Sequence, residues 1–343
     1  MSETIKKRIS NKPKKTIDND KKPASRNFAS QSKINAVGTN KKESDFSKSP
    51  KSRASSARKH SRSTVKKSAS ENSVRIVFLG GLNQIGKNIM AIECNDDIII
   101  VDCGMSFPDG EMLGVDLVIP DFSYLESNRE RIKGLVITHG HEDHIGSIPY
   151  LLRKINVPIY ATPLTVGLIT SKLKEHRLVG STKLNTVNAG ETITLGCMSV
   201  EFIRVNHSIP DAVGLAIRTP AGTIVHTGDF KIDCTPSRGE MIDLARFAEI
   251  GKEGVLAFMA DSTNAERPGY TMTERKIDQS FERLFQKAGD KRIIIATFAS
   301  NIGRLQQIIN CAAKYGKKVA FSGRSMINNV AIAQQMKYIE APE

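Results

Sequence analysis

The chain has 343 residues, which is enough for about two domains with hydrophobic cores. No stretch reaches the roughly 18 apolar residues of a membrane span, which argues against a membrane protein. Its net charge is +14, and residues 1–72 hold 20 of the 50 basic residues and 6 of the 36 acidic ones, so the whole excess lies there.

Residues 1–72 are rich in Lys, Ser and Asn and contain two aromatic residues, Phe28 and Phe46. So little apolar surface cannot offset the entropy of ordering, and we expect this segment to be disordered. A flexible basic arm attracts nucleic acid through counterion release, but a solubilising extension would have the same composition. The segment lacks the apolar core of a secretory signal.

The five cysteines are odd in number and show no C-x-x-C spacing. This pattern is typical of reduced thiols in a cytoplasmic protein, and it argues against a disulfide framework or a zinc ribbon.

From Ser73 onward, short apolar runs bounded by turn residues predict a strand-rich α/β domain. We expect strands at residues 74–81, 89–94, 97–104, 134–139, 158–162, 186–195, 198–207, 213–219, 222–230 and 254–263. Helices are expected at residues 145–155 and 163–176.

Beyond residue 260 the pattern changes to that of a second α/β domain. A helix over 273–289 has apolar residues on one face, and Thr271 with Glu274 offers a capping box at its start. A strand at 292–298, a helix at 303–316 and a strand at 317–323 would form one βαβ unit, followed by a last helix. We therefore divide the chain into a basic extension (1–72), a first domain (73–260) and an incomplete second domain (261–343).

The segment "GLNQIGKN", Gly81 to Asn88, nearly matches the phosphate-binding pattern G-x-x-x-x-G-K-[ST]. Asn88 lacks the hydroxyl group that would hold magnesium, and a strand is predicted after it where the pattern needs a helix. We interpret the glycines as turn residues near the active site.

The segment "THGHEDHIG", residues 138–146, contains three of the seven histidines. It follows an apolar strand and precedes a helix, and strand ends of open α/β sheets are where ligands bind. Further polar residues end other strands, namely Asp102, His207 and Asp229. Since strand ends converge in space, one cluster could collect all of these side chains.

Imidazole and carboxylate ligands favour zinc. The expected arrangement has His139, His141 and His207 on one zinc ion, Asp143 and His144 on a second, and Asp229 between them. Two zinc ions about 3.5–4 Å apart can activate a shared water molecule. Asp102 would lie beside them and orient a histidine ring or the water. His226 is better explained as a strand residue.

The run H-x-H-x-D-H, with an Asp upstream and a His and an Asp downstream, resembles the metallo-β-lactamase superfamily. Four further stretches resemble one branch of it, the ribonuclease J family: "GGLNQIGKNIMAIE", "DCGMSFPDGEMLGVDLVIPDFSYL", "TFASNIGRLQQ" and "FSGRSM". The resemblance runs from about Val74 to the C-terminus.

This resemblance implies a four-layer αββα metallo-β-lactamase domain interrupted by a β-CASP domain. It also implies a two-zinc ribonuclease with 5′→3′ exonuclease and endonuclease activity, acting in the cytoplasm on 5′-monophosphorylated messenger RNA and on ribosomal RNA precursors. The partners it implies are RNA, further copies of the chain and other proteins of RNA degradation. By motif position the zinc ligands are His139, His141, Asp143, His144, His207 and Asp229.

The resemblance also extends to catalytic roles. Asp102 matches the Asp of the first family motif, and Asp261 in "DSTN" matches the acidic residue that opens the β-CASP motifs. With Asp143, these carboxylates are the expected catalytic residues.

The chain departs from the family pattern at its end, because no histidine follows His226. The family's last zinc-ligating histidine and the rest of β-CASP would lie beyond residue 343. The sequence therefore predicts a C-terminally truncated product or a fragment. Two alternatives to a ribonuclease remain open: a hydrolase of the same fold that cleaves a thioester or lactone, and a non-catalytic RNA-binding fragment.

Overall fold

The computed structural model describes residues 73–236 and 239–342. The predictions made for residues 1–72 lie outside these ranges. The strands are β1 (Val74–Gly80), β2 (Ile89–Cys94), β3 (Asp97–Val101), β4 (Ile132–Val136), β5 (Ile159–Ala161), β6 (Leu184–Thr186), β7 (Thr192–Leu195), β8 (Met198–Arg204), β9 (Val213–Thr219), β10 (Gly222–His226) and β11 (Ala257–Met259).

The helices follow the first three strands in the described chain. They are α1 (Ser123–Ser127), α2 (Glu142–Ile145), α3 (Ile148–Leu152), α4 (Pro163–Glu175), α5 (Leu244–Glu253), α6 (Arg275–Ala288), α7 (Ile302–Lys314) and α8 (Arg324–Gln335), with short 3₁₀ turns η1 (Arg129–Arg131) and η2 (Val179–Ser181).

The strands form two sheets. The first has the order β1-β2-β3-β4-β5-β6, antiparallel from β1 to β3 and parallel from β3 to β6. The second has the order β11-β10-β9-β8-β7, antiparallel except for the parallel pair β10–β11. The parallel strands of the first sheet direct their carboxyl ends to one edge, where β3 and β4 end side by side.

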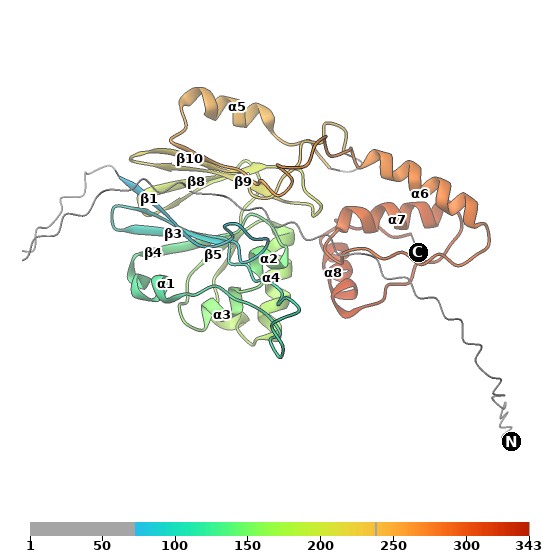
Figure 1. Ribbon diagram of the computed structural model, residues 1–343, viewed down its shortest axis with the longest axis horizontal. Helices are drawn as coiled ribbons and strands as arrows, with labels where there is room; N and C mark the ends of the chain where they lie inside the picture. The colour runs from blue at the N-terminus through green and yellow to red at the C-terminus, as the bar shows by residue number, and fades with distance from the viewer. Residues whose placement is uncertain (1–72, 237–238, 343) are drawn as a thin grey trace, which may run out of the picture. The chain divides into compact units, whose positions relative to one another are not determined.

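The two sheets pack face to face, with helices on the outer faces (Figure 1). Between the sheets, Ile99 and Val136 of the first pack with Phe202 and Leu215 of the second. The outer face of the first sheet is covered by α3 and α4, and Ile250 of α5 packs on the outer face of the second. This burial of apolar surface on each side of both sheets confirms the predicted αββα sandwich.

The C-terminal helices contact the sandwich through α4. Ile332 of α8 and Met336, the residue after α8, lie so close to Gly167 of α4 that a Cβ atom at Gly167 would be 2.6 Å from the Met336 methyl group. The helix predicted at 303–316 is confirmed as α7, and the helix predicted at 273–289 as α6. The capping box at Thr271 and Glu274 is wrong, because the Glu274 carboxylate instead pairs with Lys231 at 2.7 Å and Arg304 at 3.0 Å.

The strands predicted at 292–298 and 317–323 are also wrong, since neither pairs with another described segment. An apolar run becomes a strand when a neighbouring ladder and a buried face support it. Ile294 and Phe298 are instead 90% and 83% exposed.

Three further boundaries differ from the expectation. The helix predicted at 145–155 is two helices, since the Ser147 hydroxyl donates to the carbonyl of Gly104 and ties the chain to the end of β3. The strand predicted at 186–195 is β6 and β7, in different sheets, joined by a turn with Gly190 at φ +92°. Helix α5 was not predicted, although Asp243 caps it by accepting from the Arg246 amide.

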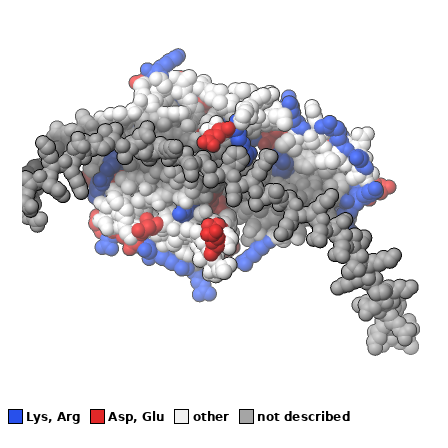
Figure 2. Space-filling view, viewed as in Figure 1, with Lys and Arg blue, Asp and Glu red and all other residues white. Residues whose placement is uncertain are grey.

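All five cysteines are free thiols, as predicted, and three of them are buried: Cys94, Cys103 and Cys311. Among the described residues, no helix is long and apolar enough to cross a membrane. On the face drawn in Figure 2, Lys and Arg side chains lie along much of the outline, with Asp and Glu groups between them.

Glu201 on β8 ties α5 to the second sheet. Its buried carboxylate accepts hydrogen bonds from Arg246 at 2.6 and 3.1 Å and lies 2.8 Å from Arg218 of β9. The hydrogen bonds from Arg246 are the largest cause that lowers the pKa of Glu201 below its ordinary value. The ionised pair therefore stabilises the fold above the ordinary pKa of glutamate, near 4.5, and the contribution is lost as the pH falls through the lowered pKa of the folded state.

We expect Glu201→Gln to lower the free energy of unfolding by about 2–4 kcal/mol at pH 7, because two guanidinium groups lose the buried carboxylate that they share and keep only more exposed carboxylate partners. Urea unfolding of both proteins at pH 7 and pH 3 checks this, and the difference between them should shrink at pH 3. Glu130→Gln, at an exposed pair with Arg129, is the control and should cost close to nothing. A difference for Glu201→Gln that is the same at both pH values would contradict the ionic origin.

Candidate metal centre

The polar side chains of residues 138–144 stand where β4 ends. The strand ends at Val136, and His139 follows fully buried. His141 is the residue that precedes α2, and this short helix carries Asp143 and His144. The second sheet brings His207 after β8 and Asp229 after β10 to the same place. The structure thus brings together all six residues expected to bind metal.

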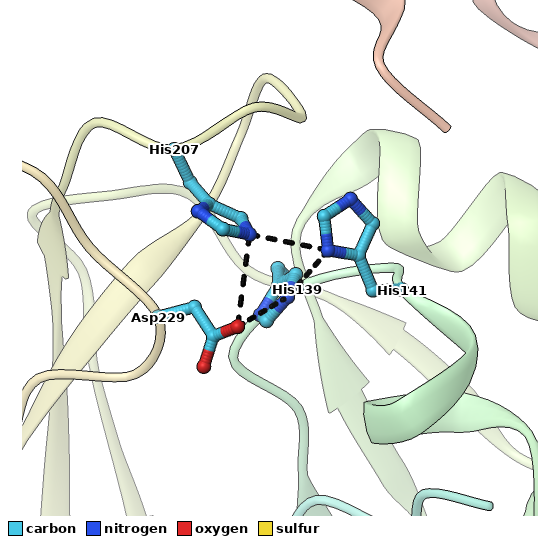
Figure 3. Close-up of side chains that lie close together, drawn as sticks. All are labelled: His139, His141, His207 and Asp229. Carbon is cyan, nitrogen blue, oxygen red and sulfur yellow. Dashed lines mark hydrogen bonds and ion pairs between the residues drawn. The ribbon is translucent and has the colours of Figure 1, made fainter. Parts of the chain in front are cut away.

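Four of them form a first group (Figure 3). Nδ1 of His141 lies 3.1 Å from Nε2 of His139 and 3.1 Å from Nε2 of His207. Oδ2 of Asp229 lies 3.9 Å from Nε2 of His139 and 3.7 Å from Nε2 of His207. Tetrahedral zinc with bonds of about 2.0–2.1 Å places its ligand atoms roughly 3.3–3.4 Å apart, so this donor set fits such an ion.

A second group consists of Asp143, His144 and Asp229. Nε2 of His144 lies 3.3 Å from Oδ1 of Asp229 and 3.6 Å from Oδ2 of Asp143. The two oxygens of Asp229 therefore face different groups, Oδ2 the first and Oδ1 the second. A carboxylate in this position can bridge two cations, and the His/Asp cluster is compatible with metal binding at two neighbouring positions.

Asp102 orients His144 of the second group by a hydrogen bond to the ring nitrogen that faces away from Asp143 and Asp229. Its buried carboxylate accepts from Nδ1 of His144 at 2.8 Å and from the Thr138 amide at 2.8 Å. This leaves Nε2 of His144 facing Asp143 and Asp229, as in carboxylate–histidine–metal triads. Asp102 also has φ +59°, a backbone conformation that costs on the order of 1–3 kcal/mol in a non-glycine residue and that often marks functional sites.

The histidines of the first group have lowered pKa values, whereas the histidine of the second group has a raised one. Burial is the largest cause that lowers the pKa of His141 to about 3 and that of His207 to about 4, and it also lowers the pKa of His139. These rings are neutral at pH 7 and keep lone pairs for a metal.

His144 differs, because the carboxylates of Asp102 and Asp229 outweigh burial and raise its pKa well above the ordinary value. The hydrogen bond from His144 is the largest cause that lowers the pKa of Asp229, to about 2, against the opposing effect of burial. Two carboxylates thus hold a proton on His144, and a bound metal ion would displace it.

Asp261 and His226 lie at the border of the site. Oδ1 of Asp261 accepts from the amide and the hydroxyl of Thr263, and Asp261 belongs to neither group of metal-binding residues. His226 is the last residue of β10, as expected, and its Nδ1 accepts from the Gly228 amide at 2.9 Å. A residue not expected here is Asn88, whose side-chain amide lies 3.3 Å from Oδ2 of Asp143.

Two clefts open on the metal-binding residues. One, of about 810 Å³, is lined by His141, Asp143, His207 and Asp229 and by residues of the C-terminal part, Phe298 among them. The other, of about 740 Å³, reaches Asp143, His144 and Asp229 from the side of the Gly81–Asn88 loop and Asp261. The centre is therefore accessible to a substrate.

Two family models match the chain. Residues 83–248 match "Metallo-beta-lactamase superfamily", and residues 290–343 match "Ribonuclease J, beta-CASP domain". The first match contains all six residues of the His/Asp cluster, and the second contains α7 and α8.

Named relatives extend the similarity over most of the described residues. The chain is 49% identical over 272 residues to "Ribonuclease J 1" of Streptococcus pyogenes, covering 79% of this chain and 48% of that protein. It is 45% identical over 279 residues to "Ribonuclease J2" of Bacillus subtilis, covering 81% of this chain and 50% of that protein. The chain thus spans about half the length of these relatives.

A solved structure supports the fold alone. It is a protein of unknown function from Enterococcus faecalis V583, with a TM-score of 0.53 and 19% identity, covering 73% of this chain and 70% of that one. These matches agree with the sandwich fold, with the grouped histidines and aspartates, and with the two family models. Over about four fifths of its length the chain is similar to ribonucleases J, and residues 83–248 match the metallo-β-lactamase superfamily.

Proposed function

We propose that this chain is the metal-binding part of a zinc-dependent ribonuclease that hydrolyses phosphodiester bonds in RNA. The observation that carries the proposal is Asp229, whose two carboxylate oxygens face two separate groups of ligand atoms. Three imidazoles and a carboxylate at the first position suit zinc by ligand type and spacing. The names of the relatives support RNA as the substrate.

The cleft of about 810 Å³ supports a single-stranded substrate. Phe107 and Phe298 line it and are 70% and 83% exposed, in the same cavity as His141 and Asp229. Exposed aromatic rings serve as stacking surfaces for bases, and they do so whatever the base. Such a site would favour an unpaired strand over a small neutral substrate such as a lactone.

The residues of the chain have separable roles in this reaction. His139, His141, His207 and Asp229 would hold one zinc ion, and Asp143, His144 and Asp229 the second. Bound there, the zinc ions would lower the pKa of water and neutralise charge on the phosphodiester. Asp102 fixes the ring of His144 through its hydrogen bond to Nδ1. Asp261 borders the site as a further carboxylate, and we propose that it acts in catalysis.

The finer parts of the proposal rest on the similarity to ribonucleases J. They are 5′→3′ exonuclease and endonuclease activity on 5′-monophosphorylated messenger RNA and ribosomal RNA precursors in the cytoplasm. They also include association with further copies of the chain or with other RNA-degrading proteins. We also propose the division into residues 1–72, 73–260 and 261–343.

The test is degradation of a 5′-monophosphorylated RNA by the 343-residue chain with zinc supplied. We expect cleavage that is abolished by a chelator and by His141→Ala, because His141 is central to the first group of ligands. His176→Ala is the control, since His176 lies at a surface contact with Tyr150 and Arg153, outside both metal-binding groups.

Two outcomes would overturn the proposal. Hydrolysis of a thioester or lactone with RNA left intact would indicate another hydrolase of this fold. RNA binding that falls steeply with salt, without any cleavage, would indicate a binding fragment, because phosphate contacts alone give such salt dependence.

A further inference from the structure

The loop Gly81–Asn88, which resembles a phosphate-binding loop in sequence, lies against the metal-binding residues instead. It leads into strand β2, so no helix N-terminus is present to face a phosphate. The amide of Asn88 donates to the carbonyl of Asp143 at 3.1 Å, and the carbonyl of Asn88 accepts from the Gly104 amide at 2.9 Å. The loop is thus attached by its backbone to the residues that carry the second group of ligands.

The side chain of Asn88 points at those ligands. Its Nδ2 lies 3.1 Å from the carbonyl oxygen of Asp143, 3.3 Å from Oδ2 of Asp143 and 3.1 Å from Nε2 of His144. A carbonyl and a carboxylate oxygen can only accept, so the NH₂ end of the amide must face Asp143. Oδ1 then points toward Gly81, where a Cβ atom would be 2.8 Å from it.

This contact restrains a ligand that is otherwise open to solvent. The side chain of Asp143 is 31% exposed, whereas that of His144 is 3% exposed and is already fixed by Asp102. A metal site gains affinity when its ligands are held in place before the ion arrives, and outer hydrogen bonds supply that restraint. Asn88 would restrain the side chain of Asp143 by a hydrogen bond, as Asp102 restrains the ring of His144.

We propose that Asn88 is a positioning residue for the second metal position, where its side-chain amide holds the carboxylate of Asp143 toward His144 and Asp229. The proposal also explains why asparagine stands where the phosphate-binding pattern has Ser or Thr. Two N–H groups on one planar amide reach the backbone and the side chain of Asp143 together, and a single hydroxyl cannot donate twice. The inference depends on the proposed metal centre, but it does not depend on ribonuclease activity.

The test is calorimetric titration of the metal-free chain with zinc, comparing wild type and Asn88→Ala. We expect the second equivalent to bind roughly 10–100-fold more weakly in the variant, which is the usual effect of removing an outer hydrogen-bond partner. The first equivalent, at His139, His141 and His207, should be unchanged. Gln84→Ala is the matched control, because it removes an exposed amide from the same loop.

The variant should fold, since the Asn88 backbone amide still donates to the carbonyl of Asp143. Circular dichroism and thermal unfolding of the metal-free proteins check this. Equal weakening of both equivalents would indicate a general structural role and would overturn the proposal. An unchanged affinity for the second equivalent in Asn88→Ala would also overturn the proposal. A wild-type chain that binds no zinc would contradict the metal centre itself, an outcome distinct from either.

Discussion

Asp229→Ala should weaken binding of both metal ions, whereas His141→Ala should weaken only the first and Asp143→Ala only the second. The reason is the position of the Asp229 carboxylate, which has Oδ2 3.7 Å from His207 and Oδ1 3.3 Å from His144. Its pKa of about 2 keeps it ionised at any pH at which the protein would be studied. Each affinity should fall by more than the roughly 10–100-fold caused by loss of an outer partner, because the proposed metal centre makes Asp229 a direct ligand.

Zinc titration of the three variants measures these affinities, and RNA cleavage should be lost in each. Asp116→Ala removes an exposed carboxylate outside both groups and serves as the control. If Asp229→Ala affected one equivalent and spared the other, the bridging position would be wrong.

Gly104→Ala should also have a large effect, on both the stability of the fold and the binding of the second metal ion, because it forces two backbone segments apart. Gly104 lies between Cys103, whose amide donates to the carbonyl of His144, and Met105, whose amide donates to that of Glu142. A Cβ atom at Gly104 would overlap the backbone carbonyl of Asp143. Backbone cannot rotate away as a side chain can, so the end of β3 and helix α2 would have to separate.

We expect Gly104→Ala to lower the free energy of unfolding by about 3 kcal/mol or more, at the upper end of overpacking effects. The second zinc equivalent should be lost with it, because Asp143 and His144 would be displaced. Urea unfolding and zinc titration give the two quantities. Gly110→Ala is the control, as its Cβ atom would meet nothing within 4 Å. Near-wild-type stability of Gly104→Ala would contradict the close approach of these segments.

The residues of the His/Asp cluster could be selected from sequence because they lie in the short segments that follow β4, β8 and β10. An apolar run that stops at a polar residue identifies His139, His207 and Asp229 without any knowledge of the sheet order. The α/β class followed from the alternation of apolar strands and helices, whereas the αββα sandwich was implied by the resemblance to the metallo-β-lactamase superfamily.

Other features depend on tertiary contacts that no local pattern records. The segments 292–298 and 317–323 have the composition of strands, but pairing requires a neighbour, and none of the described segments provides one. Asn88 contacts Asp143, which is far away in the chain, and the left-handed backbone at Asp102 occurs where its carboxylate contacts Thr138 and His144. Helix α5 could have been predicted from local sequence, since Asp243 and the apolar spacing after it indicate a helix start.

The proposed ligands of the centre come from both sheets, with His139 after β4 of the first sheet and His207 and Asp229 after β8 and β10 of the second. A bound ion therefore acts as a cross-link between the two halves of the sandwich. By thermodynamic linkage, free zinc at 100 times its dissociation constant would add about 2.7 kcal/mol to the stability of the folded state. For this chain, metal supply would then govern how long the protein persists as well as what it can catalyse.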